Sequence, residues 1–395
     1  MDAHTEIARA IDNYRDKVVA LSHEIHEHPE LKFEEHFAAD LLTKAAADLG
    51  LEVEREVGGL KTAFRAEFGG KGPAVAILAE YDALPNGHSC GHNLIAGAAL
   101  SAVAGLKSIA GNLPGRVVFL GTPAEEGGGG KIILVDKGAL RGVDAAMMAH
   151  PTDVEYCTMP ALATHHLKIT FHGRSAHASA APWDGSSALS AVIQTFQSVD
   201  AMRLHLRDGS RVHGIITDGG QAVNIIPERT ECQFLARAKT SRYANEIGAR
   251  VLRCAEAAAM ATGTRVEHVV IGGYKNMINN HSMAHRFAAH SEALGTKSIE
   301  APDNIPTGST DMGDVSHVMP AIHPLFAISR PGDGNCHEDA FVSHADSKHG
   351  YDAMIRVAKA MALTTYDLLA QPELLAAAKK EFEDSQGKLN GKSAR

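Results

Sequence analysis

The sequence predicts an α/β protein with a mixed central sheet, helices on both faces of that sheet, and an inserted domain of α+β type. Strongly apolar strands alternate with helical segments over the first part of the chain. From about residue 162 the strands alternate between apolar and polar residues, which is typical of half-exposed sheets. A length of 395 residues favours two domains over one core. We therefore predict a main domain formed by residues 1–161 and 276–395 and an inserted domain at residues 162–275.

The first part of the main domain is predicted to begin with two helices, at 4–28 and 34–49. Apolar residues recur there at helical spacing, and Pro29 and Gly50 follow as termination signals. Strands are then expected at 51–56, 62–68, 74–80, 116–121 and 144–149, and helices at 94–110 and 131–138. The strand at 74–80 is apolar almost throughout, as expected for a sheet that is buried on both faces.

The inserted domain is predicted to have the element order strand, helix, strand, strand, helix, strand. The strands are expected at 165–171, 211–217, 229–238 and 264–271, and the helices at 186–205 and 241–262. This order is typical of an α+β sandwich with helices on an antiparallel sheet. The main domain then resumes with a helix at 282–293, a strand at 324–328 and a helix at 347–369, and we expect residues 391–395 to fray.

Composition excludes several classes of protein. A net charge of −9 argues against nucleic-acid binding, which needs a concentrated basic patch. No apolar run is long enough for a membrane span, and the N-terminus does not have the pattern of a signal peptide. Five irregularly spaced cysteines form no disulfide framework and favour a reducing, cytoplasmic location. The 23 histidines point instead to metal binding or acid–base chemistry.

Seven side chains suited to metal binding or proton transfer follow four of the predicted strands. They are Asp82, Cys90 and His92 after the strand at 74–80, Glu125 and Glu126 after that at 116–121, His150 after that at 144–149, and His337 after that at 324–328. Ligands of open α/β sheets bind at the carboxyl ends of the strands. We therefore expect these side chains to gather at one edge of the central sheet.

This set of residue types predicts a two-metal hydrolase centre. Zn²⁺ accepts Cys, His and carboxylate ligands together, whereas Mn²⁺ suits the carboxylates and imidazoles better than the thiolate. The adjacent pair Glu125 and Glu126 allows one carboxylate to bind metal while the other handles the proton of an attacking water. The four glycines that follow, residues 127–130, allow close approach of the backbone.

Each motif alone has an ordinary structural explanation. A Glu-Glu pair before glycines is usually a solvated turn, a lone Cys-Gly-His usually binds nothing, and His150 and His337 could be a core and a loop residue. A phosphate-binding loop is disfavoured because no Gly-Lys-Ser/Thr follows the glycines. Only the joint occurrence of these motifs at strand ends favours the metal centre over the structural explanations.

Seven motifs together give the chain a family resemblance along essentially its whole length. They are Asp82-Ala-Leu-Pro85, His88-Ser-Cys-Gly-His92, Pro123-Ala-Glu-Glu-Gly-Gly128, Gly173-Arg-Ser-Ala-His177, Asn224-Ile-Ile-Pro227, Gly308-Ser-Thr-Asp311 and His337. The sequence resembles the aminoacylase and carboxypeptidase-like metallopeptidase family. That family includes auxin-conjugate hydrolases, hippurate hydrolases and p-aminobenzoyl-glutamate hydrolase subunits.

The resemblance implies a role for each matching residue. The implied metal ligands are Cys90, His92, Glu126, His150 and His337, with two divalent ions (Zn or Mn) per subunit and Cys90 shared between them. Glu125 is the implied general base, and Asp82 is expected to orient a ligand. A homodimer through the inserted domain is implied, in which His177 reaches the partner's active site and stabilises the oxyanion. The implied substrate-binding residues are Asn224, Arg237, Gly308 and Ser309.

Three departures from the family pattern leave the substrate open. Many members have His two residues before the Asp of the Asp-x-x-Pro element, where this chain has Glu80. Auxin-conjugate hydrolases usually have Asp where this chain has Asn93, and the late His337-Glu-Asp-Ala-Phe341 differs from the commoner His-x-Pro-x-Phe. These features move the chain toward the p-aminobenzoyl-glutamate hydrolase and dipeptidase-like branch.

We therefore predict a metal-dependent amidohydrolase that cleaves small N-acyl amino acids or dipeptide-like conjugates. One alternative is hydrolysis of another C–N bond at the same centre, by deamination of an aromatic amine or cleavage of a carbamoyl group. Another alternative is a non-catalytic binding protein on the same scaffold, which the intact set of candidate ligands disfavours. Tyr81, Trp183 and Tyr274 lie near the motifs, where they would either line an aromatic pocket or serve plain packing.

Overall fold

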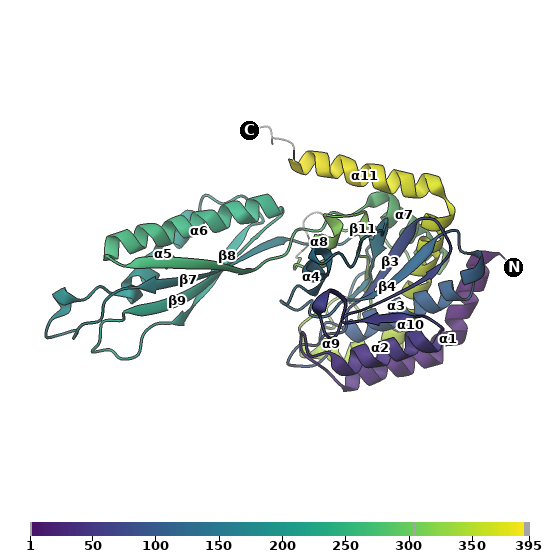
Figure 1. Ribbon diagram of the computed structural model, residues 1–395, viewed down its shortest axis with the longest axis horizontal. Helices are drawn as coiled ribbons and strands as arrows, with labels where there is room; N and C mark the ends of the chain where they lie inside the picture. The colour runs from purple at the N-terminus through teal and green to yellow at the C-terminus, as the bar shows by residue number, and fades with distance from the viewer. Residues whose placement is uncertain (1, 303–304, 306, 391–395) are drawn as a thin grey trace. The chain divides into compact units, whose positions relative to one another are not determined.

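The structure, a computed structural model, describes residues 2–302, 305 and 307–390 and divides into two compact units (Figure 1). The main unit comprises residues 1–160, 277–306 and 311–395, and the inserted unit comprises residues 161–276 and 307–310. The inserted unit thus takes in residues 307–310, which the sequence assigned to the main domain. The expected fraying of residues 391–395 lies outside the described residues.

The main unit is built on a mixed six-stranded sheet with the strand order β1-β2-β4-β3-β5-β11. The strands are β1 (Val53–Arg55), β2 (Phe64–Gly69), β3 (Ala74–Ala79), β4 (Arg116–Gly121), β5 (Ala145–Met147) and β11 (Ala321–Ile322). β3 pairs in parallel with β4 and β5, whereas β2 pairs antiparallel with β1 and β4. All six residues of β3 are buried, as predicted from its apolar sequence. The predicted α/β fold class with a mixed sheet is confirmed.

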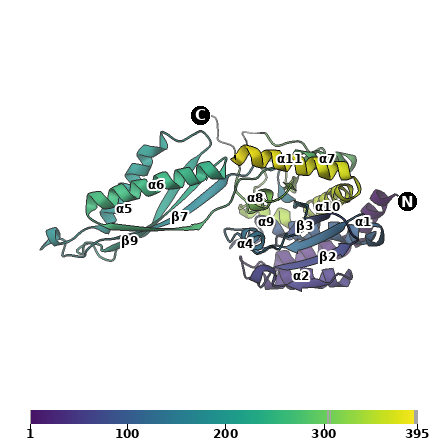
Figure 2. The ribbon, with the colours of Figure 1, turned by 45° about the horizontal axis from the view of Figure 1, so that its top comes forward.

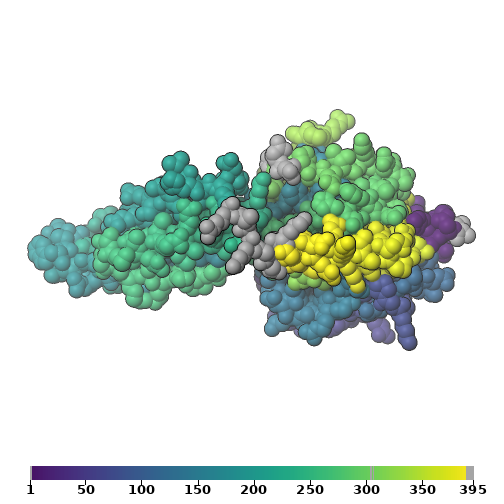
Figure 3. Space-filling view, turned by 90° about the horizontal axis from the view of Figure 1, so that it is seen from above, coloured from purple at the N-terminus to yellow at the C-terminus, as the bar shows by residue number. Residues whose placement is uncertain are grey.

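Helices lie on both sides of this sheet, as Figure 2 shows around β2 and β3. They are α1 (Ala3–Glu27), α2 (His36–Asp48), α3 (His92–Lys107), α4 (Gly130–Asp136), α7 (His281–Ala293), α8 (Met312–Ser316), α9 (Asp339–Ala345), α10 (Lys348–Ala370) and α11 (Pro372–Asn390). The sequence did not predict α8, α9 or α11, and Figure 3 shows α11 on the surface of the main unit. None of the helices in the described part of the chain is long and apolar enough to cross a membrane.

The helix α3 is buried along nearly its whole length because its small residues admit neighbouring helices. A Cβ atom at Gly97 would lie 2.4 Å from the sulfur of Met354 in α10, and one at Gly105 would lie 2.6 Å from Ile11 in α1. These glycines therefore allow α1 and α10 to pack closely against α3. The packing fixes the N-terminus of α3, where the first candidate ligands lie.

A separate pair of parallel strands, β6 (His150–Thr152) and β12 (Leu325–Ala327), lies outside the central sheet. The predicted strand at 324–328 was expected to belong to that sheet. Pro324 explains the difference, because it has no N–H to donate and separates β11 from β12. As a result His150 begins a strand of its own, and its N–H donates to the carbonyl oxygen of Pro324.

The inserted unit is a four-stranded antiparallel sheet with the strand order β10-β7-β9-β8. Its elements are β7 (Ala163–His172), α5 (Ala188–Arg203), β8 (Arg211–Asp218), β9 (Arg229–Ala238), α6 (Ser241–Thr262) and β10 (Arg265–Gly272), in the predicted order. Alternate residues of β9, such as Phe234 and Ala236, are buried, because one face of a strand points toward the core. Short 3-10 turns occur at Val57–Gly59 and Ala110–Asn112 in the main unit and at Pro182–Asp184 in the inserted unit.

Candidate metal centre

Gly91 sets the positions of Cys90 and His92 at the N-terminus of α3. Its φ of +71° is a conformation that favours glycine, and a Cβ atom there would lie 2.7 Å from Cγ of Pro151. Any larger residue would therefore push this turn away from β6. Cys90 and His92 are both buried beside the strand that begins at His150.

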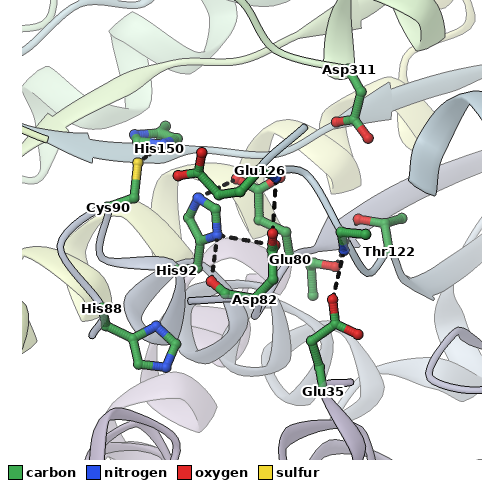
Figure 4. A network of polar contacts seen from close by, with 12 residues as sticks. Glu35, Glu80, Asp82, His88, Cys90, His92, Thr122, Glu126, His150 and Asp311 are labelled. Carbon is green, nitrogen blue, oxygen red and sulfur yellow. Dashed lines mark hydrogen bonds and ion pairs between the residues drawn. The ribbon is translucent and has the colours of Figure 1, made fainter. Parts of the chain in front are cut away.

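His92 and His150 each keep Nε2 available as a ligand atom (Figure 4). The Nδ1 atom of His92 lies 2.9 Å from the carbonyl oxygen of Asp82, and that of His150 lies 2.7 Å from the carbonyl oxygen of Pro151. A carbonyl oxygen can only accept, so Nδ1 carries a hydrogen, and in the neutral ring Nε2 holds the lone pair. This is the tautomer that a metal-binding imidazole needs.

The Asp82 carboxylate joins the two segments that carry the candidate ligands. Its Oδ1 atom lies 3.2 Å from Nδ1 of His92, and its Oδ2 atom accepts a hydrogen bond of 2.9 Å from the backbone N–H of Glu126. Figure 4 shows both contacts. The structure thus places Asp82 where it orients His92 and the turn at Glu126.

Glu35 holds the turn before the Glu125-Glu126 pair and was missed in the sequence. Ala124 has a φ of +61°, which is strained for a residue with a side chain. Its N–H donates a hydrogen bond of 2.8 Å to Glu35, which also accepts from the hydroxyl of Thr62. Burial raises the pKa of Glu35. No local sequence pattern reveals this role, because Glu35 lies 89 residues from its partner.

The ligand atoms form several groups, two of which share the sulfur of Cys90. One group joins Cys90, His92 and Glu126, and a second joins Cys90, His150 and Cys336. Within each group the ligand atoms lie within 4.8 Å of one another. A third group joins Glu80, His92 and His150. Cys90 therefore lies where a ligand shared by two ions would lie.

Three buried polar atoms in these groups make no well-formed hydrogen bond within the described residues. Nε2 of His92 lies 3.4 Å from Oε1 of Glu80, and Oε1 of Glu126 lies 3.3 Å from Nε2 of His337. Buried polar atoms are almost always paired, and a bound cation is one way to satisfy them. Thiol, imidazole and carboxylate together suit a divalent transition metal. The residues present therefore fit the predicted pair of metal ions.

His337 reaches the centre from the loop before α9. Its Nε2 atom lies 3.3 Å from Oε1 of Glu126, and its own N–H donates a hydrogen bond of 2.8 Å to the carbonyl oxygen of Ser89. A φ of +76° turns the backbone at this residue. The structure thus brings His337 to Glu126 and His150 to Cys90. It places His92 in one group with Cys90 and Glu126 and in another with Glu80 and His150.

The two neighbouring glutamates differ in their affinity for a proton. Burial raises the pKa of Glu125 well above its ordinary value, and the charges of Glu80 and Asp311 add to this shift. Burial also acts on Glu126, but the nearby imidazole of His337 and the charge of His92 outweigh it and lower the pKa. Such a division suits one proton-transferring and one ligating carboxylate.

A buried ion-pair network lies beside the centre and was not anticipated. The ammonium of Lys131 lies 2.6 Å from Oε2 of Glu80 and 2.7 Å from Oδ1 of Asp311, and all three side chains are fully buried. Two carboxylates raise the pKa of Lys131 although burial opposes the charge. Lys131 directly follows the glycine run and Asp311 ends the Gly308-Ser-Thr-Asp311 motif, but no local pattern pairs the two residues.

The candidate residues of the inserted unit lie in two places. At one end, the N–H of Ala178 donates to the carbonyl oxygen of Asn224, and His177 forms a bridge with Ile225. The Nδ1 atom of the exposed His177 accepts from the N–H groups of Ser179 and Ala180, so its Nε2 carries the hydrogen.

Arg237, Gly308 and Ser309 gather at the opposite end of this sheet. The guanidinium of Arg237 donates a hydrogen bond of 3.0 Å to the hydroxyl of Ser309, and the carbonyl oxygen of Gly308 accepts from Leu162. Arg229 and Arg237 are eight residues apart on β9, which is about 26 Å at 3.3 Å per residue. His172, at the end of β7 that leads to His177, pairs with Arg229. His177 and Arg237 therefore lie toward opposite ends of this sheet.

Three residues in or directly beside the motifs form hydrogen bonds with other parts of the fold. His88 donates to the carbonyl oxygen of Ile25, and Asn93 donates to Ser22 and to the carbonyl oxygen of Ala345. Tyr81 is fully buried, and its hydroxyl donates to the carbonyl oxygen of Thr62. Tyr81 thus serves packing rather than an aromatic pocket. Trp183, in contrast, is 76% exposed.

The chain is similar to known proteins along most of its length. The model of peptidase family M20/M25/M40 matches residues 76–360. An Xaa-Arg dipeptidase of Mus musculus is 38% identical over 397 residues, which cover 95% of this chain and 91% of that protein. A p-aminobenzoyl-glutamate hydrolase subunit of Escherichia coli is 30% identical, and the match covers 95% of this chain and 93% of that protein.

Two solved structures share the fold. The aminobenzoyl-glutamate utilization protein of Klebsiella pneumoniae has a TM-score of 0.74 at 18% identity, and the match covers 92% of this chain and 98% of that one. A dinuclear metal binding peptidase from the M20 family, from Bacillus subtilis, has a TM-score of 0.70 at 20% identity and covers 91% and 99%. The likeness therefore includes both the main and the inserted unit.

Proposed function

Since the chain belongs to peptidase family M20/M25/M40 and is a metal-dependent hydrolase as predicted, we propose that it cleaves the amide bond of dipeptide-like or N-acyl amino acid substrates. The observation that carries this proposal is the pair Glu125 and Glu126. Glu126 belongs to a ligand group with Cys90 and His92, while the neighbouring Glu125 is buried and has a raised pKa.

In this proposal Glu125 is the general base. Two bound divalent ions, Zn²⁺ or Mn²⁺, would be held by Cys90, His92, Glu126, His150 and His337 and would supply Lewis acidity and a water of lowered pKa. Glu125 takes a proton from the attacking water and later gives it to the leaving amine.

The inserted unit is proposed to bind substrate and to supply His177 from the partner of a homodimer. The Arg237 guanidinium, beside Ser309, is suited to a substrate carboxylate. His177 carries an outward N–H that is suited to a developing oxyanion. Its separation from Arg237 along β9 supports action on the partner's site rather than its own. The relatives that act on dipeptides and p-aminobenzoyl-glutamate support a substrate with a free carboxylate.

We also propose a cytoplasmic location, where thiols stay reduced. All five cysteines are free in the structure. Reduced thiols are usual in the cytosol and are required for a thiolate ligand at Cys90.

Replacement of the general base tests the proposal. Glu125→Gln keeps the shape of the side chain but cannot accept the proton, so kcat should fall about 10²–10⁴-fold while metal content stays unchanged. The exposed Glu52→Gln is the control and should keep full activity. An active Glu125→Gln enzyme would rule out this role.

A product-resolved substrate panel tests the reaction. The panel should contain dipeptides, N-acyl amino acids, aromatic amines and carbamoyl compounds. We expect release of free amino acid from the first two classes. Ammonia release without any free amino acid would instead favour deamination or carbamoyl cleavage at the same centre.

A further inference from the structure

Cys336 lies at the metal centre although no motif gave it a role. It directly precedes His337, and its sulfur lies within 4.8 Å of both Sγ of Cys90 and Nε2 of His150. Each of the other two residues is buried. The second ligand group of the centre therefore contains two thiols and one imidazole.

Two backbone contacts fix this thiol in place. The N–H of His337 donates 2.8 Å to the carbonyl oxygen of Ser89, which ties the residue after Cys336 to the residue before Cys90. The thiol of Cys336 lies 3.5 Å from the carbonyl oxygen of Pro151, the same oxygen that orients the ring of His150. The three ligand atoms thus converge from three separate segments of the chain.

The spacing of the group suits a tetrahedral ion. With Zn–S of about 2.3 Å and Zn–N of about 2.0–2.1 Å, a sulfur and a nitrogen on one tetrahedral zinc are about 3.5 Å apart. Sγ of Cys90 and Nε2 of His150 lie 3.5 Å apart. A thiol from Cys336 would add a second soft ligand to the same position.

We propose that Cys336 is a sixth protein ligand of the metal centre and that the two thiolates of Cys90 and Cys336 make the His150 position selective for a thiophilic divalent cation, of which Zn²⁺ is the type. This inference rests on the proposed metal-dependent function and adds metal selectivity to it. On binding, the Cys336 thiol loses its proton to solvent and exchanges its contact with Pro151 for the ion. Thiolates favour Zn²⁺ over Mn²⁺, which prefers carboxylate and imidazole ligands.

Cobalt substitution counts the thiolates directly. Metal-free protein is loaded with Co²⁺, and the thiolate-to-cobalt charge-transfer absorption in the near ultraviolet is measured. In Cys336→Ser the band should fall to about two-thirds, because a shared Cys90 makes two of the three Co–S bonds and Cys336 makes the third. Cys254→Ser, on α6 of the inserted unit, is the matched control and should leave the band unchanged. A band of wild-type intensity in Cys336→Ser would overturn the proposal.

Metal competition gives a second readout. Equilibrium dialysis against mixtures of Zn²⁺ and Mn²⁺ should show that Cys336→Ser and Cys336→Ala each lower the Zn²⁺ preference about 10–100-fold. Circular dichroism checks that each variant is folded. Two substitutions are made so that one remains for the assay when the other does not fold. An unchanged preference in the folded variants would contradict the inference. Because neither assay measures hydrolysis, the inference and the proposed reaction can fail independently.

Discussion

The main unit and the inserted unit differ in what they bury. The main unit buries a set of ionisable side chains, among them Glu80, Asp82, Lys131 and Asp311. Among the described residues of the inserted unit, the buried polar side chains are uncharged: Thr195, Thr230, Asn276 and Thr310. Buried charges contribute little to stability compared with apolar packing, so their concentration in one unit indicates chemistry there.

This contrast predicts different consequences of substitution in the two units. In the main unit, removing one partner of a buried ion pair should affect folding and metal binding together. In the inserted unit, the exposed candidate residues should affect catalysis alone. The predictions below run from the largest expected effect to the smallest.

Lys131→Met should destabilise the main unit by about 3–5 kcal/mol, because it leaves Glu80 and Asp311 buried without their counter-charge. Urea unfolding measures this loss. The control is Lys379→Met, which removes a half-exposed lysine from Asp144 in the same unit and should cost less than about 1 kcal/mol. Equal losses of unfolding free energy in the two variants would show that the buried network stabilises the unit no more than a half-exposed ion pair does.

His177→Ala should lower kcat about 10²–10³-fold by removing an oxyanion donor. Its unfolding midpoint should not move, because the side chain is exposed on the inserted unit. Steady-state kinetics and thermal unfolding on one preparation check both parts. A loss of stability that matched the loss of rate would assign His177 a structural role instead.

Mixing two inactive variants tests whether His177 acts in trans. A heterodimer of Glu125→Ala and His177→Ala subunits contains one site with both residues intact. Random mixing should therefore restore about a quarter of wild-type activity. If mixtures of the refolded variants stay inactive while heterodimers form, the trans assignment is wrong.

Asp367→Asn should cost about 1.5–3 kcal/mol, because the buried carboxylate accepts from His4 and His290 and so joins α1, α7 and α10. Burial opposes ionisation of Asp367, but the hydrogen bonds from these histidines lower its pKa. A lowered pKa contributes stability above the unfolded value of about 3.9, and this contribution is lost as the pH falls through the folded pKa.

Unfolding of wild type and Asp367→Asn should therefore differ at neutral pH and converge in acid. The exposed Asp16→Asn on α1 is the control and should follow the wild type at every pH. A constant difference between Asp367→Asn and wild type down to the acid limit would show that the pairing does not depend on ionisation.

Sequence patterns predicted those residues of the candidate site that lie directly after predicted strands. Cys90, His92, Glu126 and His150 follow buried strands, and the carboxyl ends of parallel strands bring such residues together. The fold class and the element order of the inserted unit followed from periodicity in the same way. Each of these features depends on residues that are close along the chain.

The rest depends on contacts between distant residues. Lys131 and Asp311 are 180 residues apart, and Glu35 and Ala124 are 89 apart, so no local pattern indicates either pair. The separate pair β6 and β12 was missed because Pro324 redirects the chain after β11. Cys336 was overlooked because only the folded structure brings the loop before α9, and with it the Cys336 sulfur, close to Cys90.

Metal analysis coupled to product detection tests the central claim most directly. The account predicts about two equivalents of divalent metal per chain. A chelator should abolish release of amino acid from the dipeptide and N-acyl panel, and added Zn²⁺ or Mn²⁺ should restore it. Full amide hydrolysis by metal-free protein would contradict the account.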